Sequence, residues 1–274
     1  MRAYIINLDR AEDRRTFFER AFAGTKFDLC RISAVDGDTL KVPVEGYSEE
    51  LYRCFHGRPT NLRHVGCYLS HVKAMEAFLA TNDEHALIAE DDLVLRPDFE
   101  AALEAALSYS QHWNILRLTG LSRGRRAKVA RLCGDYSLCV SFGRLKGTGA
   151  YVLDRAAARA WLARLLPMRL PIDHALDREW FYGLRAVYIL PFPAYQTESG
   201  FFSSIHLGTS MKLSALRRSV TTYPYQALNE VMRWLFRTLS YLRMRLTIVS
   251  SPKSMEDLTK TTRMGLKLED EWSE

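Results

Sequence analysis

The sequence is poor in cysteine. Its 274 residues include five cysteines, an odd number, and no two of them have the spacing of a Cys-x-x-Cys motif. A disulfide framework and a zinc knuckle are therefore both poorly supported. We expect free thiols in a reducing compartment.

Long apolar runs are also missing. The first one, Ala3-Tyr4-Ile5-Ile6, is four residues long and ends at Asn7, which is too short for the hydrophobic region of a secretory signal. No segment approaches the roughly 20 apolar residues of a membrane-spanning helix. The phosphate-binding patterns GxxxxGK[ST] and strand-linked GxGxxG are absent as well. We expect a cytoplasmic protein.

What is present is the composition of a folded protein with unevenly placed charge. Hydrophobic residues make up 47% and charged residues 26%, and the net charge is +6. Residues 117–131 carry six basic side chains and no acidic one, and residues 206–253 carry eight against a single acidic residue. This distribution fits an anionic partner. We do not expect nucleic acid, because the basic patch at 123–131 lacks interleaved aromatic residues.

The order of apolar segments predicts an α/β fold. Segments typical of strands lie at residues 2–8, 27–32, 86–89, 113–118, 147–153 and 186–190, and segments typical of helices lie at 11–22, 66–79, 99–107 and 156–166. Strands that alternate with helices favour a mainly parallel sheet flanked by helices. Residues 38–60 contain two prolines and two glycines and are predicted to form a long irregular connection.

The C-terminal part has a different pattern. We divide the chain into a catalytic domain, 1–209, and a helical tail, 210–274, that is first basic and then acidic. In the tail, apolar residues recur every three or four positions, which predicts a basic amphipathic helix of about six turns. The apolar stripe comprises Leu228, Val231, Leu235, Leu239, Leu242 and Leu246, with Arg233, Arg237 and Arg243 on the opposite side.

Two arrangements of this helix are open. It can lie on an anionic membrane, with its arginines and the bordering Trp234 and Tyr241 at the interface. Alternatively, the stripe packs on the catalytic domain or on a second subunit, and the arginines face water.

The strongest local signal is Glu90-Asp91-Asp92, which follows the apolar segment 86–89. In an extended chain, residues 90 and 92 point to one side and residue 91 to the other. Adjacent carboxylates repel one another unless a cation or solvent compensates, and their oxygens suit Mg²⁺ or Mn²⁺. A solvated acidic turn is the alternative.

Several motifs resemble glycosyltransferase family 25, the lipooligosaccharide β-galactosyltransferases and collagen galactosyltransferases. The opening segment 2–15 is similar to the start of that family. Further similar elements follow in the same order: Arg31-Ile-Ser-Ala-Val-Asp-Gly37, Val65-Gly-Cys-Tyr-Leu-Ser-His71, Ala86-Leu-Ile-Ala-Glu-Asp-Asp92, Trp113-Asn-Ile-Leu-Arg-Leu118, Gly147-Thr-Gly-Ala-Tyr-Val-Leu153 and Pro171-Ile-Asp-His174. The resemblance covers about residues 1–205 and implies a GT-A fold, a nucleotide-sugar donor, a divalent metal ion and inversion at the anomeric carbon.

The resemblance also implies roles for individual residues. It places Asp92 on the metal ion, and Glu90 or Asp91 toward the ribose or the donor sugar. The residues expected near the nucleotide are Asn7, Asp9, Arg14 and Asp36. For Asn7 and Asp36, a turn-stabilising role is the alternative.

Inversion needs a general base for the acceptor hydroxyl. Asp173 is the candidate, with Asp177 and Glu179 as alternatives. Asp173 could instead cap a helix over 174–182, because Asp is a favoured N-cap residue.

Two histidines are assigned by similar reasoning. His206 is a candidate to complete the metal shell, because some GT-A enzymes use a late histidine there. His71 lies among apolar residues and is expected to be structural.

These features predict an inverting hexosyltransferase that uses UDP-galactose or UDP-glucose and Mn²⁺ or Mg²⁺. The expected acceptor is a lipooligosaccharide or lipopolysaccharide core glycolipid, because a chain without a secretory signal does not suit the collagen branch. We expect a peripheral protein of the inner membrane, with homo-oligomers possible. A non-catalytic, membrane-docked binding module on the same fold is the alternative.

Overall fold

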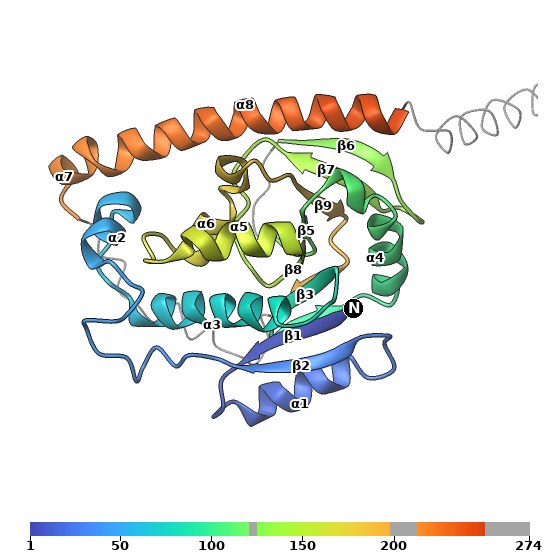
Figure 1. The fold of residues 1–274 in the computed structure, drawn as a ribbon, viewed down its shortest axis with the longest axis horizontal. Helices are drawn as coiled ribbons and strands as arrows, with labels where there is room; N and C mark the ends of the chain where they lie inside the picture. Colours follow the sequence, from blue (N-terminus) through green and yellow to red (C-terminus); the bar gives the residue numbers. More distant parts are fainter. Residues whose placement is uncertain (121–124, 198–212, 250–274) are drawn as a thin grey trace, which may run out of the picture.

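The computed structural model describes residues 1–120, 125–197 and 213–249 (Figure 1). Within these residues, an eight-stranded sheet has the order β2-β1-β3-β8-β5-β9-β7-β6. Its strands are β1 (Arg2–Asn7), β2 (Asp28–Ser33), β3 (His85–Glu90), β5 (Ile115–Arg117), β6 (Arg126–Arg131), β7 (Ser137–Ser141), β8 (Ala150–Asp154) and β9 (Ala186–Leu190). A separate two-stranded sheet pairs β4 (Leu93–Leu95) with β10 (Ala194–Gln196).

The large sheet is mixed, although most of its strands share one direction. β1 is parallel to β2 and β3, and β5 is parallel to β9. β8 and β7 run against their neighbours. The α/β class and the common strand direction agree with the prediction, but the antiparallel β8 and the β6–β7 hairpin do not. β6 escaped prediction because it is an edge strand with alternating basic side chains, the usual composition of a protected sheet edge.

Helices cover the sheet (Figure 1). They are α1 (Glu12–Ala21), α2 (Glu49–His56), α3 (Leu62–Leu79), α4 (Phe99–Leu107), α5 (Arg155–Leu165), α6 (Ile172–Leu176), α7 (Ala215–Val220) and α8 (Thr222–Val249). α2 lies in the connection that we predicted to be irregular. It begins where the Ser48 side chain accepts a hydrogen bond from the Leu51 amide, a local N-cap that the prolines and glycines around it obscured.

Alternating side chains along the strands build a core on each face of the sheet. Ile5 and Leu87 belong to one core, which also receives side chains from α1, α4 and α8. Tyr4 and Ile88 belong to the other core, which lies under α3 and α5. This alternation follows from the two-residue period of a strand, and it fixes which polar residues emerge at the strand ends.

The tail helix α8 buries the side that we predicted to be exposed. It packs on the protein with its arginine side: Arg233 is 3% exposed and Arg237 is 4% exposed. The expectation that these two arginines face lipid or water is therefore wrong. The reason is that Asp177 and Glu179, which the linear pattern does not connect to α8, lie buried beneath it. The leucine stripe faces outward instead.

Two further findings concern the tail. No helix among the described residues combines the length and the apolarity needed to cross a bilayer. The predicted domain boundary at 209/210 lies outside the described residues.

Candidate active site

The acidic turn lies in a cleft at the carboxyl ends of β1 and β3. Its walls come from the end of β1, the start of α1, the loop 34–37, α3 and the turn 90–92. Ligands of α/β proteins commonly bind at this edge of the sheet, where strand ends and helix starts converge.

Glu90 and Asp92 point toward the same side chain. The amide Nε2 of Gln196 donates to Glu90 Oε2 at 2.9 Å and to Asp92 Oδ1 at 3.1 Å. Burial and the nearby charge of Glu90 raise the pKa of Asp92 to about 6. Two carboxylates held this close favour a cation between or beside them, and their hard oxygen atoms fit Mg²⁺ or Mn²⁺.

The second oxygen of Glu90 faces the protein interior. Thr148 Oγ1 donates to Glu90 Oε1 at 2.9 Å, and His71 Nε2 lies 3.8 Å from the same oxygen. Burial would raise the pKa of Glu90, but the contacts with His71, Thr148 and Gln196 outweigh it and hold the pKa below its ordinary value. His71 is fully buried, and its Nδ1 lies 3.0 Å from the Tyr151 hydroxyl. It is thus a structural residue, as expected, but one that touches the site.

Asp91 points the other way, as the extended geometry predicted. Arg14 Nη1 donates to its Oδ1 at 2.8 Å, and Asn7 Nδ2 donates to its Oδ2 at 2.7 Å. Burial raises the pKa of Asp91, although Arg14 and Asn7 oppose this shift. Asn7 also donates to the Ala11 carbonyl and accepts from Arg31. Asn7 and Asp91 therefore use their polar atoms to hold the cleft wall together.

Asp36 and Asp9 lie in different surroundings. Asp36 lines the cleft, where Arg10 Nε lies 2.8 Å from its carboxylate. Asp9 is not among the residues that line the cleft. It binds Arg31 and Ser33 at the surface, and hydrogen bonds from these two side chains lower its pKa.

Two glycines bring the loop 34–37 against α3. A Cβ on Gly66 would lie 2.5 Å from the Val35 carbonyl oxygen, and one on Gly37 would lie 2.4 Å from Arg63 Cα. Ser70 Oγ accepts a hydrogen bond from the Val35 amide at 2.8 Å. The close backbone approach places Asp36 on the cleft wall.

Asp173 lies near this edge of the sheet without being a helix cap. Its Oδ2 accepts from the Gly147 amide at 3.5 Å, one residue before the threonine that binds Glu90. The N-cap of α6 is Pro171, and α6 ends at Leu176. The alternative in which Asp173 caps a helix over 174–182 is therefore wrong, because the helix starts earlier and is shorter. His206 lies outside the described residues.

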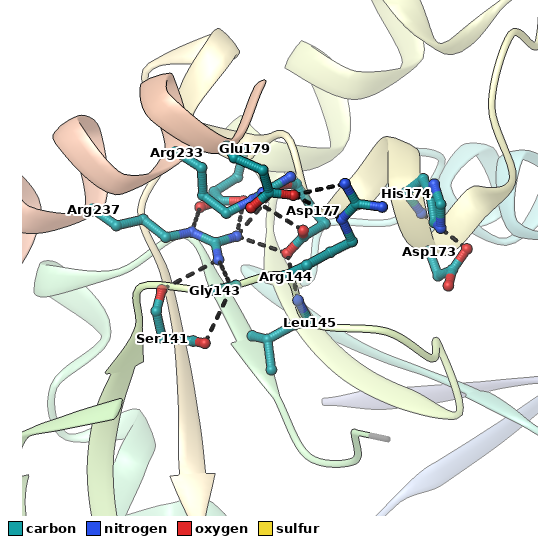
Figure 2. A network of polar contacts seen from close by, with 11 residues as sticks. Ser141, Gly143, Arg144, Leu145, Asp173, His174, Asp177, Glu179, Arg233 and Arg237 are labelled. Carbon is teal, nitrogen blue, oxygen red and sulfur yellow. Dashed lines mark hydrogen bonds and ion pairs between the residues drawn. The ribbon is translucent and has the colours of Figure 1, made fainter. Parts of the chain in front are cut away.

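Asp177 and Glu179 are committed to α8 (Figure 2). Arg237 Nη2 donates to Asp177 Oδ1 at 2.8 Å, and Arg237 Nε donates to Glu179 Oε1 at 2.6 Å. Arg233 Nε lies 3.1 Å from Asp177 Oδ2. Burial alone would lower the pKa of Arg237, but Glu179 and Asp177 raise it above its ordinary value. Both carboxylates are engaged by arginine side chains, whereas the carboxylate of Asp173 contacts backbone amides.

Three residues of the site were missed by sequence reasoning. Gln196 gave no signal, because it follows the acidic turn by more than a hundred residues and reaches it through the β4–β10 pair. Thr148 lies between two glycines in the motif at residues 147–153. Its polar side chain at that position was a signal by which it could be identified as a site residue. Cys67 lies one helical turn before His71, and its Sγ, a His71 nitrogen and a Glu90 oxygen lie within 4.8 Å of one another. Burial raises the pKa of the Cys67 thiol.

The sequence comparison decides the family. The profile of glycosyltransferase family 25 (LPS biosynthesis protein) matches residues 1–176. The chain belongs to glycosyltransferase family 25. The matched part contains the residues that line the cleft, the acidic turn and Asp173, whereas Gln196 lies beyond it.

Curated family 25 proteins cover part of the chain. A glycosyltransferase 25 family member of Anopheles gambiae is 28% identical over 63% of this chain and 30% of its own length. Procollagen galactosyltransferase 1 of Danio rerio is 26% identical over 63% of this chain and 30% of its own length. A probable inactive glycosyltransferase 25 family member 3 of Rattus norvegicus is 28% identical over 63% of this chain and 32% of its own length. The chain therefore matches about a third of the length of these relatives.

Structural neighbours are distant. The inositol-1-phosphate CTP transferase from T. maritima aligns with a TM-score of 0.38 and 11% identity, over 76% of this chain and 94% of that one. A197 from STIV aligns with a TM-score of 0.39 and 12% identity, over 72% and 86%. Scores this low carry no functional argument.

Proposed function

We propose that the chain is an inverting hexosyltransferase. It transfers galactose or glucose from a UDP-sugar to a core sugar of lipooligosaccharide or lipopolysaccharide. The observation that carries the proposal is the convergence of Glu90 and Asp92 in the cleft at the end of β3. Family membership supports glycosyl transfer, and the name of the zebrafish relative supports galactose as the donor sugar. The sheet with helices on both faces supports a GT-A-like fold.

Asp92 is the proposed ligand of Mn²⁺ or Mg²⁺. The divalent ion would neutralise the charge that develops on a diphosphate leaving group. Glu90, held by Thr148 and Gln196, presents its carboxylate toward the donor. Asp36 and Arg14 line the same cleft and are proposed to face the donor as well.

Asp173 is the proposed general base. A carboxylate can accept the proton of the acceptor hydroxyl while that oxygen attacks the anomeric carbon. The contacts of Asp173 within the described residues are backbone amides, those of Gly147 and His174. Asp177 and Glu179, in contrast, are neutralised by arginine. This difference in partners is what favours Asp173.

A non-catalytic binding module is the second candidate. It is favoured by one observation: a relative from Rattus norvegicus is named as probably inactive. Such a protein would bind a nucleotide-sugar or a glycolipid through the same cleft without transferring the sugar.

A panel of nucleotide-sugars, with and without Mn²⁺, separates the two candidates. We expect UDP release from UDP-galactose or UDP-glucose only when the metal ion is present, and faster release when a core oligosaccharide is added. Binding of UDP without release from any donor, in the presence of Mn²⁺ and acceptor, would establish the binding module instead.

A further inference from the structure

The outer face of α8 is an apolar surface that the described part of the molecule leaves uncovered. The exposed fractions of its side chains are 61% for Leu228, 56% for Val231, 43% for Leu235, 63% for Leu239 and 51% for Leu242. We refer to these five residues as the outer stripe. Contiguous apolar surface of this extent on a folded protein usually marks a docking site.

The stripe lies opposite the arginines that anchor the helix. At about 100° per residue, Leu228, Leu235 and Leu239 fall within about 40° of one another around the helix axis, and Arg237 lies on the far side. Arg237 is held by two carboxylates and by the carbonyl oxygens of Ser141 and Gly143 (Figure 2). The anchor fixes the rotation of α8, so turning the leucines inward would break a buried ion-pair network. The outward orientation of the stripe is therefore built into the fold.

The charges around the stripe identify its partner. Arg217 precedes it on α7, Arg243 flanks it near its end, and both are exposed. Glu230, the acidic residue of α8, is exposed, but its carboxylate is paired with Arg144 and Arg233. The exposed side of this helical segment thus offers apolar and basic groups, which suits a surface that is apolar with an anionic rim.

We infer that the outer stripe docks α8 flat on an anionic lipid bilayer. Leucine and valine side chains enter the boundary of the acyl chains, and the flanking arginines meet lipid phosphates. Trp234 and Tyr223 are both exposed on this segment, and their rings, apolar with a polar edge, are favoured at such an interface. A second copy of the chain is a poorer partner, because the segment is basic at both ends, so two stripes packed together would bring basic ends against basic ends in either orientation.

Docking of α8 on a membrane would also position the segment that carries Asp173, the proposed general base. Arg233 pairs with Asp177, and Arg237 pairs with both Asp177 and Glu179. These two acidic residues follow Asp173 in the same segment. A helix seated on lipid therefore holds the segment that carries the proposed base close to the membrane surface. This last step rests on the proposed function, whereas the docking itself rests on α8 alone.

Co-sedimentation with liposomes tests the docking. The full chain should sediment with phosphatidylglycerol-containing vesicles at low salt and much less with pure phosphatidylcholine vesicles. Replacing Leu235, Leu239 and Leu242 by Gln should reduce the partition coefficient at least tenfold, while the melting temperature stays close to that of the wild type because these side chains are exposed. Two single variants provide a matched control. Leu239→Gln, on the outer stripe, should weaken sedimentation with the vesicles, whereas Val42→Gln, outside α8, should leave it unchanged.

Two outcomes would overturn the docking proposal. One is wild-type protein that stays in the supernatant with anionic vesicles at low salt. The other is a wild-type dimer in light scattering that becomes monomeric in the triple variant while vesicle binding is unchanged, because the stripe would then be a subunit interface. UDP release from the donor in detergent-free solution reports on the proposed function separately, so the loss of one property does not imply the loss of the other.

Discussion

The three adjacent carboxylates of Glu90, Asp91 and Asp92 have two different roles. Glu90 and Asp92 share the Gln196 amide and face the cleft. Asp91 is turned into the protein, where Arg14 and Asn7 hold it. Substitutions in this turn should therefore separate into those that affect chemistry and those that affect the cleft wall.

Asp92→Asn tests the metal site. The amide keeps the size of the carboxylate but loses its charge, so we expect turnover to fall by at least about 10²-fold, on the order of 3 kcal/mol in transition-state stabilisation. UDP release at saturating Mn²⁺ measures the effect. Full turnover of this variant, or of wild-type protein in excess EDTA, would contradict the assignment.

Asp173→Asn tests the general base. Asn can retain a hydrogen bond from the Gly147 amide but cannot accept a proton at neutral pH. We expect a nearly unchanged melting temperature and transfer to the acceptor reduced by about 10²-fold or more. Asp177→Asn is the contrasting variant, because it removes a buried partner of Arg237 and should lower stability first. Transfer within a few-fold of wild type in Asp173→Asn would mean that the base lies elsewhere.

At the scale of elements, α8 is held by charge where its sequence pattern suggested apolar contact. The Arg237 side chain lies between α8 and the rest of the protein, where it pairs with Asp177 and Glu179. All three side chains are buried. Met244 and Ile248 add apolar contacts near the end of α8. Removing one partner of a buried ion pair leaves the other charges uncompensated.

Arg237→Gln should destabilise the protein by about 3 kcal/mol or more. Urea unfolding measures it as a lower midpoint. Arg243→Gln is the control, since Arg243 is exposed and its loss should change stability by less than about 0.5 kcal/mol. Equal midpoints for the two variants would show that the network does not stabilise α8.

The contact between the loop 34–37 and α3 gives a second prediction for an element. In Gly66→Ala, the added methyl group meets the Val35 carbonyl oxygen, a backbone atom that cannot swing away. We expect weaker donor binding together with lower stability, because the loop that carries Asp36 must move. Titration of UDP by calorimetry detects the change, and Gly134→Ala, where a Cβ has open space but a positive φ, controls for glycine loss without a clash. Unchanged UDP affinity in Gly66→Ala would show that the loop position is not critical.

At the scale of the whole molecule, α8 completes the fold that contains the cleft. Its arginines neutralise carboxylates of the segment 177–179, and it contacts β6 and β7. The family profile ends at residue 176, so α8 lies outside the matched region although it contacts β6 and β7 within it.

A chain ending at residue 209 should therefore fold poorly, even though it contains the entire matched region. Without α8, Asp177 and Glu179 lack their arginines, and a part of the core lacks its cover. Circular dichroism melting should show a loss of the cooperative transition, whereas a chain ending at residue 249 keeps every contact described above and should retain a cooperative transition. A sharp, unshifted transition in the 1–209 chain would support an independent catalytic domain.

Sequence patterns were sufficient to predict the family, the α/β class, most strands of the sheet and the alternation within the acidic turn. Each of these depends on local patterns: strand period, helix period and short motifs in a fixed order. The tertiary structure alone decided that Gln196 joins Glu90 to Asp92, that Asn7 and Asp91 support the wall, and which side of α8 is buried. These features depend on partners far apart along the chain. A helical pattern shows that two faces differ, but the orientation of α8 follows from Asp177 and Glu179, because a buried carboxylate requires a cation more strongly than a leucine requires burial.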